Sequence, residues 1–148
     1  MNGRPEVFFT DRDLGKRFPE ILREADLTVQ RHDDHFEAET PDEVWLAAVG
    51  ARGWIAVTHN RRIRHTPNER DAVMRHGVAL LVVVGVAPFP ELANNFVVTL
   101  PRVRRFVARN HPPFIAKVYR PAPVHGRRPG RAPGQVERWY PPLSPSGS

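Results

Sequence analysis

Acidic and amide side chains that could bind a metal ion lie at the ends of three segments that are distant in the sequence. Asp11 and Asp13 follow one short apolar segment, and Asn60 follows another. Asp42 and Glu43 stand at the start of a helical segment between them. Carboxylate and amide oxygens suit hard divalent cations such as Mg²⁺, which are bound by a few carboxylates, water and phosphate oxygens. We therefore predict a Mg²⁺ (or Mn²⁺) site with the ligands Asp11, Asp13, Asp42, Glu43 and Asn60.

Such a site could hydrolyse phosphodiester bonds, because a bound divalent ion activates water and neutralises charge on a phosphate. The densest basic cluster follows Asn60 directly and comprises Arg61, Arg62 and Arg64. The planar guanidinium group can bind a phosphate through two hydrogen bonds. We predict that these arginines bind an RNA backbone, and ordinary surface charge is the alternative.

Each candidate ligand also has a purely structural interpretation. Asp11 could be the N-cap of a helix, and Asp13 could favour a helix N-terminus through its dipole. Asp42 and Glu43 are residues expected in a first helical turn, where Glu43 also fits a capping box. Asn60 suits a turn after a strand. Glu69 is interpreted chiefly as a capping-box residue.

Two further polar clusters receive weaker functional interpretations. The run His32–His35 has the composition of a Zn²⁺ site, but no third motif supports it, and we predict a solvated loop. Four arginines near residue 105 belong to a helical segment and predict a solvated face, with a partner interface as the alternative. They are Arg102, Arg104, Arg105 and Arg109.

The elements that position these residues alternate between strand and helix. Strands are expected at 7–10, 27–31, 54–58, 78–84 and 114–119. Helices are expected at 14–25, 41–52, 67–76 and from 91 to about 107, the last kinked or divided by Pro101. This order predicts an α/β fold with a mostly parallel five-stranded sheet covered on both faces. Sites in such folds form beyond the carboxyl ends of the strands, where the strand order reverses.

The composition is that of one globular domain with a basic C-terminal segment. The 148 residues carry a net charge of +6, which favours a polyanionic partner such as RNA. Residues 121–148 hold seven Pro, four Gly and four Arg, and we predict a disordered basic tail after a domain of residues 1–120. The absence of cysteine and of long apolar runs leads us to expect a cytoplasmic protein without a membrane segment.

The three oxygen-bearing segments resemble the acidic motifs of the PIN-like family. They read Phe8-Phe9-Thr10-Asp11, Thr40-Pro41-Asp42-Glu43 and Ile55-Ala56-Val57-Thr58-His59-Asn60. The resemblance covers about residues 6–120 and is closest to VapC-type toxins and related PIN-like proteins of unknown function. It implies a three-layer PIN-like fold and a Mg²⁺- or Mn²⁺-dependent endoribonuclease, the toxin of a type II toxin–antitoxin pair, inhibited by a cognate antitoxin. Its catalytic residues would be Asp11, Asp42 and Asn60.

The third motif departs from the family pattern, because Asn60 stands where these relatives usually carry Asp. Its amide oxygen can hold the position, but the site loses one negative charge and is expected to bind a cation more weakly. The alternative function is therefore a catalytically weakened PIN-like module that binds RNA or a partner. A third alternative is a receiver-like signalling domain with Asn60 at the phosphoacceptor position. Whether the protein forms a homodimer is left open.

Overall fold

A single sheet of six strands organises the computed structural model, which describes residues 5–121 and 134–142 except the side chain of Arg64. Its strand order is β2-β1-β3-β4-β5-β6. The strands are β1 (Phe8–Thr10), β2 (Val29–Arg31), β3 (Ile55–Thr58), β4 (Ala79–Val83), β5 (Phe114–Val118) and β6 (Val136–Tyr140). The first five pair in parallel, and β6 pairs antiparallel to β5. The α/β class and the mostly parallel sheet are thus confirmed.

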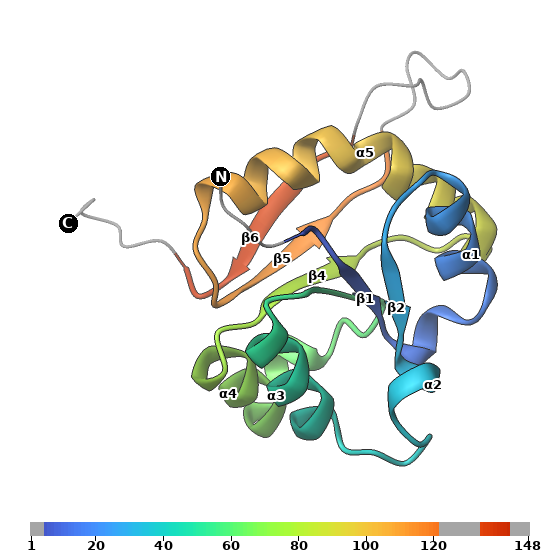
Figure 1. The fold of residues 1–148 in the computed structure, drawn as a ribbon. Coiled ribbons are helices and arrows are strands. Elements are labelled where there is room, and N and C mark those ends of the chain that lie inside the picture. The colour runs from blue at the N-terminus through green and yellow to red at the C-terminus, as the bar shows by residue number, and fades with distance from the viewer. Residues whose placement is uncertain (1–4, 122–133, 143–148) are drawn as a thin grey trace.

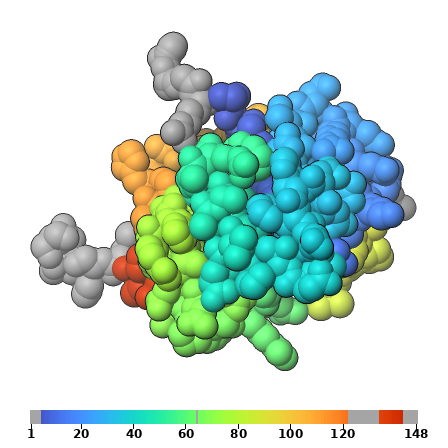
Figure 2. Space-filling model, turned by 60° about the horizontal axis from the view of Figure 1, so that its bottom comes forward, coloured from blue at the N-terminus to red at the C-terminus, as the bar shows by residue number. Residues whose placement is uncertain are grey.

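Helices cover both faces of the sheet and give three layers (Figure 1). They are α1 (Arg17–Glu24), α2 (His32–His35), α3 (Asp42–Arg52), α4 (Pro67–Arg75) and α5 (Phe89–Arg109), with 3₁₀ turns at Arg12–Leu14 and Ile63–His65. Helices α1 and α5 lie together on one face, and α3 and α4 lie on the other. Figure 2 shows α2, α3 and α4 side by side at the surface of that second face. No helix in the described ranges has the length and apolarity to cross a membrane.

Alternation along the strands divides the apolar side chains between two cores. Phe8 packs with α1 and α5, whereas its neighbour Phe9 packs against Trp45 of α3. Strands β3, β4 and β5 alternate in the same way, so their residues are buried on both sides. Parallel strands between two helical layers require such continuous apolar runs. Burial on both faces fixes the register and hence the positions of the strand ends.

The prediction of a tail without regular structure from residue 121 is wrong for residues 136–140, which form β6. The aromatic pair Trp139-Tyr140 packs against the core beneath α3 and α4, and Val136 packs against the other core. Lys117 of β5 lies 4.3 Å from the ring centre of Trp139. These side chains supply enough apolar contact to order the strand despite the surrounding proline and glycine. The rest of the predicted tail, residues 122–133 and 143–148, lies outside the described residues.

Three local predictions also differ from the structure. Helix α5 is continuous through Pro101, so the segment is not divided into two short helices. Neither α3 nor α4 has a side-chain N-cap; the hydroxyl of Thr66 donates to the carbonyl of Arg62 at 3.1 Å instead. The predicted solvated loop at His32–His35 is the short helix α2, in which His32 is only 3% exposed among Phe9, Phe36 and Trp45.

Candidate functional site

The carboxyl ends of β1 and β3 form the point where the strand order reverses. The chain leaves β1 for β2 on one side, and later returns to β3 on the other side. Asp11 extends the ladder by one hydrogen bond, since its backbone N–H donates to the carbonyl of Val57 at 2.9 Å. Its carboxylate is thereby held beside the end of β3, at the position predicted for a ligand site in an open α/β sheet.

The hydroxyl group of Thr58, which is fully buried, links the segment after β1 to the segment after β3. It donates to Oδ2 of Asp11 at 2.8 Å and lies 3.3 Å from Oδ2 of Asp13. It also accepts from the backbone N–H of Asn60 at 3.1 Å. A hydroxyl has one hydrogen to donate, so it can serve only one of the two carboxylates at a time.

The carboxylate of Asp13 also accepts a hydrogen bond from the backbone after β3. The N–H of His59 lies 3.2 Å from both oxygens of Asp13. The His59 ring contacts Phe89 at the start of α5, with ring centres 6.0 Å apart. The segments after β1, β3 and β4 therefore meet at one edge of the sheet, as the sequence predicted for Asp11, Asp13 and Asn60.

Burial and like charges raise the pKa of these acids. Burial first, and then the charge of Asp13, raise the pKa of Asp11 from 3.8 to about 7, although the hydrogen bond from Thr58 opposes this. Desolvation also raises the pKa of Asp13, while the N–H and charge of His59 lower it. The charge of Asp42 contributes to both increases, which places it within electrostatic reach of the pair.

A second group of carboxylates stands at the starts of α3 and α4. Trp45 donates through its indole N–H to Oδ1 of Asp42 at 2.9 Å, so the core of this layer fixes that carboxylate. Glu69 hydrogen-bonds Asp42, and burial together with Asp42 and Glu43 raises its pKa to about 7. The interpretation of Glu69 as a capping residue missed this role. The signal was available, because Thr66-Pro67-Asn68-Glu69 repeats the pattern of Thr40-Pro41-Asp42-Glu43.

Asn60 lies in a turn after β3, as its structural interpretation predicts. Its Oδ1 accepts from the backbone N–H of Arg62 at 3.0 Å, and its own N–H is bound to Thr58. The turn carries Arg61 and Arg62 to exposed positions next to the acidic residues. The side chain of Arg64 lies outside the described part of the chain. Asn60 thus shapes the loop beside the site, with one lone pair of its amide oxygen already engaged.

The donor set of the site fits a divalent cation, since all donors are oxygens and the charges of Asp13 and Asp42 raise the pKa of Asp11. A cation among them would remove that repulsion. Within the described residues, no three His, Cys, Asp or Glu side chains converge closely enough to hold an ion by themselves. Asp11, Asp13 and Asp42 are each turned toward a local donor instead. Mg²⁺ commonly uses only one or two protein carboxylates, with water and substrate phosphates completing its shell.

One of three comparisons with known proteins gives a match. No curated protein and no solved structure gives a significant match. A family model described as a PIN like domain matches residues 6–85, more than half of the 148 residues. The match begins just before β1 and ends just after β4, so it contains every acidic residue of the site. The chain therefore belongs to the PIN-like domain family.

Proposed function

We propose that this protein is a divalent-metal-dependent endoribonuclease that uses Mg²⁺ or Mn²⁺. PIN-like domains have a nuclease-type fold, and the proposal rests on one observation above all. Asp11 and Asp13 share the single hydroxyl of Thr58 at the reversal point of the sheet. Two carboxylates around one buried donor favour a cation between them, and the protein's net charge of +6 favours a polyanionic substrate.

Asp11 and Asp13 would hold the ion, with Asp42, Glu43 and Glu69 as the second group of oxygen donors. When bound, the ion would activate a water molecule and neutralise charge on the phosphate. Thr58 orients Asp11, and Trp45 orients Asp42. The exposed side chains of Arg61 and Arg62 would bind the RNA backbone next to the scissile phosphate.

Asp11→Ala is expected to lower cleavage of a labelled RNA in Mg²⁺ or Mn²⁺ by at least about 100-fold, because the best-positioned metal ligand is lost. Glu69→Gln is expected to lower cleavage less, since Glu69 lies in the second group. Asp71→Ala is the matched control, because Asp71 is exposed on α4. Cleavage that Asp11→Ala leaves unchanged would show that the site is assigned wrongly.

Asn60→Asp is expected to raise cleavage and to strengthen metal binding. Aspartate keeps the oxygen that accepts from the N–H of Arg62, so the turn is retained, and it adds the missing negative charge. Initial cleavage rates over a Mg²⁺ or Mn²⁺ titration measure the effect, and a lower half-saturating concentration is expected. Asn68→Asp, an exposed addition of equal charge on α4, is the control.

The second candidate is a module that binds RNA or a partner without efficient turnover. Its motivation is the engagement of the Asn60 amide oxygen in the turn, which leaves the third family motif without a free carboxylate. This module would bind RNA with the same affinity in a chelator and in Mg²⁺. Neither Mg²⁺ nor Mn²⁺ would produce cleavage by the wild type or by Asn60→Asp.

We also propose that the protein is the toxin of a type II pair and binds an antitoxin. Support comes from the family resemblance and from two exposed apolar side chains near the site. Val86 is 85% exposed, and Phe89, which contacts His59, is 38% exposed. Induced expression is expected to arrest growth, and Asp11→Ala is expected to remove the arrest. Growth arrest by both forms would argue against a nuclease toxin.

A further inference from the structure

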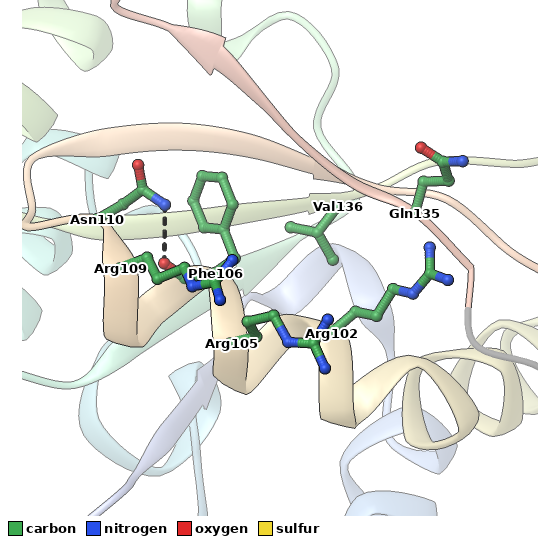
Figure 3. Close-up of a pocket in the computed structure, with 7 residues that line it drawn as sticks. All are labelled: Arg102, Arg105, Phe106, Arg109, Asn110, Gln135 and Val136. Atoms are coloured by element: carbon green, nitrogen blue, oxygen red, sulfur yellow. Dashed lines mark hydrogen bonds between the residues drawn. The ribbon is translucent and has the colours of Figure 1, made fainter.

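An arginine-lined groove lies between the second half of α5 and the start of β6. Its volume is about 310 Å³. Arg102, Arg105 and Arg109 follow one another along the helix, with Phe106 and Val136 between the helix and the strand (Figure 3). Asn110 and Gln135 complete the lining. Both walls lie outside residues 6–85, so this groove is formed by a part of the chain that the family match does not include.

The positive charge of this groove is unbalanced. Arg102, Arg105 and Arg109 are exposed, and no hydrogen bond or ion pair within the described ranges engages them. Their neighbour Arg104, by contrast, pairs with Glu6 at 2.7 Å. Among the described residues, the groove therefore presents three cationic side chains without an anionic partner, and a bound anion would neutralise them.

The acidic site and this groove lie toward opposite ends of α5. Phe89, the first residue of α5, contacts His59 beside the acidic residues. The groove arginines follow it by 13 to 20 residues. At 1.5 Å per residue, they lie about 20–30 Å farther along the helix axis. The groove is consequently a separate surface, which a bound polymer could reach from the acidic site.

We propose that the groove binds the phosphate backbone of an RNA strand at a distance from the cleavage site. This inference rests on the proposed ribonuclease function. Arginines three and four residues apart are offset by about 4.5 and 6 Å along the helix, so they can serve successive anionic groups on one strand. Their guanidinium forks suit phosphate oxygens. The amide of Gln135 supplies hydrogen-bonding groups for the sugar edge, whereas the amide of Asn110 is held by the carbonyl of Phe106 and by Arg138.

The test is RNA binding by the triple variant R102Q/R105Q/R109Q. Fluorescence anisotropy of a labelled 20-nucleotide single-stranded RNA, in EDTA and at several salt concentrations, measures affinity without cleavage. We expect about tenfold weaker binding at moderate salt. The slope of log affinity against log salt should become shallower by about 2, because each lost phosphate contact contributes about 0.7.

The matched control is K16Q/R52Q/R75Q, which removes the same charge from exposed positions just before α1, on α3 and on α4. Loss of affinity in both variants, or in neither, would overturn the proposal. Equal competition by polyglutamate and by unlabelled RNA would also overturn it, since the groove would then bind acidic peptide. Circular dichroism melting should give the wild-type curve for both variants.

Cleavage separates this proposal from the proposed function. R102Q/R105Q/R109Q should raise KM for the 20-nucleotide RNA and leave KM for a trinucleotide unchanged, because the short substrate cannot span both sites. Equal effects on both substrates would contradict a distant backbone site. A wild-type protein that binds RNA through the groove but cleaves nothing would refute the nuclease function and leave the groove assignment intact.

Discussion

Asp11→Asn is expected to abolish RNA cleavage and, at pH 8, to raise the melting temperature by roughly 5 °C. Asparagine keeps one oxygen for the hydroxyl of Thr58. It has no second oxygen for the backbone N–H of Arg12, which donates to Oδ1 of Asp11 at 2.7 Å, and this lost hydrogen bond offsets about 1 kcal/mol of the gain in stability. The loss of a carboxylate ligand accounts for the loss of activity. The gain in stability follows from the pKa of Asp11, which is about 7 in the folded protein instead of 3.8.

The sign of the pH dependence follows from this raised pKa. Below pH 3.8 the carboxyl of Asp11 is protonated in the folded and unfolded states, and its stabilising contribution is complete. Between 3.8 and about 7 the unfolded chain releases the proton while the folded protein keeps it, so the free energy of unfolding falls as pH rises. The loss by pH 8 is at most about 4 kcal/mol, and 1 kcal/mol corresponds to about 2–4 °C for a chain of this size.

Thermal melts at pH 5 and pH 8 measure this effect. The difference between wild type and Asp11→Asn should be clearly smaller at pH 5 than at pH 8, because only about a third of the loss between pH 3.8 and about 7 has occurred by pH 5. Asp71→Asn controls for the change in net charge and should leave the melting temperature unchanged, because Asp71 is exposed. Added Mg²⁺ or Mn²⁺ should stabilise the wild type at pH 8 and leave Asp11→Asn unaffected. An equal stability difference at both pH values would contradict the raised pKa.

Gly50→Ala is expected to destabilise the protein by about 2 kcal/mol, although alanine is the better helix former. In an open helix the exchange would stabilise by up to about 1 kcal/mol. A Cβ at position 50, however, would collide with the backbone carbonyl oxygen of His76 at the end of α4. Backbone atoms cannot rotate away, so the two helices must separate, and overpacking of this kind costs about 1–3 kcal/mol.

Urea denaturation of Gly50→Ala measures this cost, and Ala51→Gly is its control on the exposed side of the same helix. Removing a methyl at 51 and adding one at 50 should both destabilise, the second more strongly. Cleavage should also fall, because α3 and α4 carry Asp42 and Glu69 at their first turns. If Gly50→Ala were more stable than the wild type, α3 and α4 would not pack closely enough for a side chain at position 50 to meet the carbonyl of His76.

Periodicity and strand ends made much of the fold predictable from the sequence. The apolar runs indicated the five parallel strands, and their alternation with helices indicated the two covering layers. Because parallel strands end at one edge, the order of residues along the chain predicted that Asp11, Asp13 and Asn60 lie near one another. The sequence did not indicate Thr58, whose buried hydroxyl bonds Asp11 and accepts from the N–H of Asn60. The helix predicted at 41–52 ends at Arg52 as expected, and Gly53 follows it with a φ of 69°.

The remaining features depend on contacts that local patterns do not record. β6 forms because Trp139 and Tyr140 pack against the core beneath α3 and α4. The proline- and glycine-rich sequence around them does not indicate this contact. The predicted capping boxes do not form, because neither α3 nor α4 has a side-chain cap hydrogen bond. Thr66 donates to the carbonyl of Arg62, and Glu69 hydrogen-bonds the side chains of Asp42 and Thr66. His32 is buried because three aromatic rings surround it, which a polar run of four residues concealed.

The antiparallel strand β6 has a consequence for solubility during synthesis. β5 reads Phe114-Ile115-Ala116-Lys117-Val118, and an apolar edge of this kind is a template for aggregation until it is paired. A ribosome makes β5 before β6, so the edge stays open while the intervening residues are translated. Once paired, β6 presents Glu137 and Arg138 on the new outermost strand, and such charges discourage further pairing. The strand that follows the proline-rich segment therefore acts as the chain's own protection against edge-to-edge association.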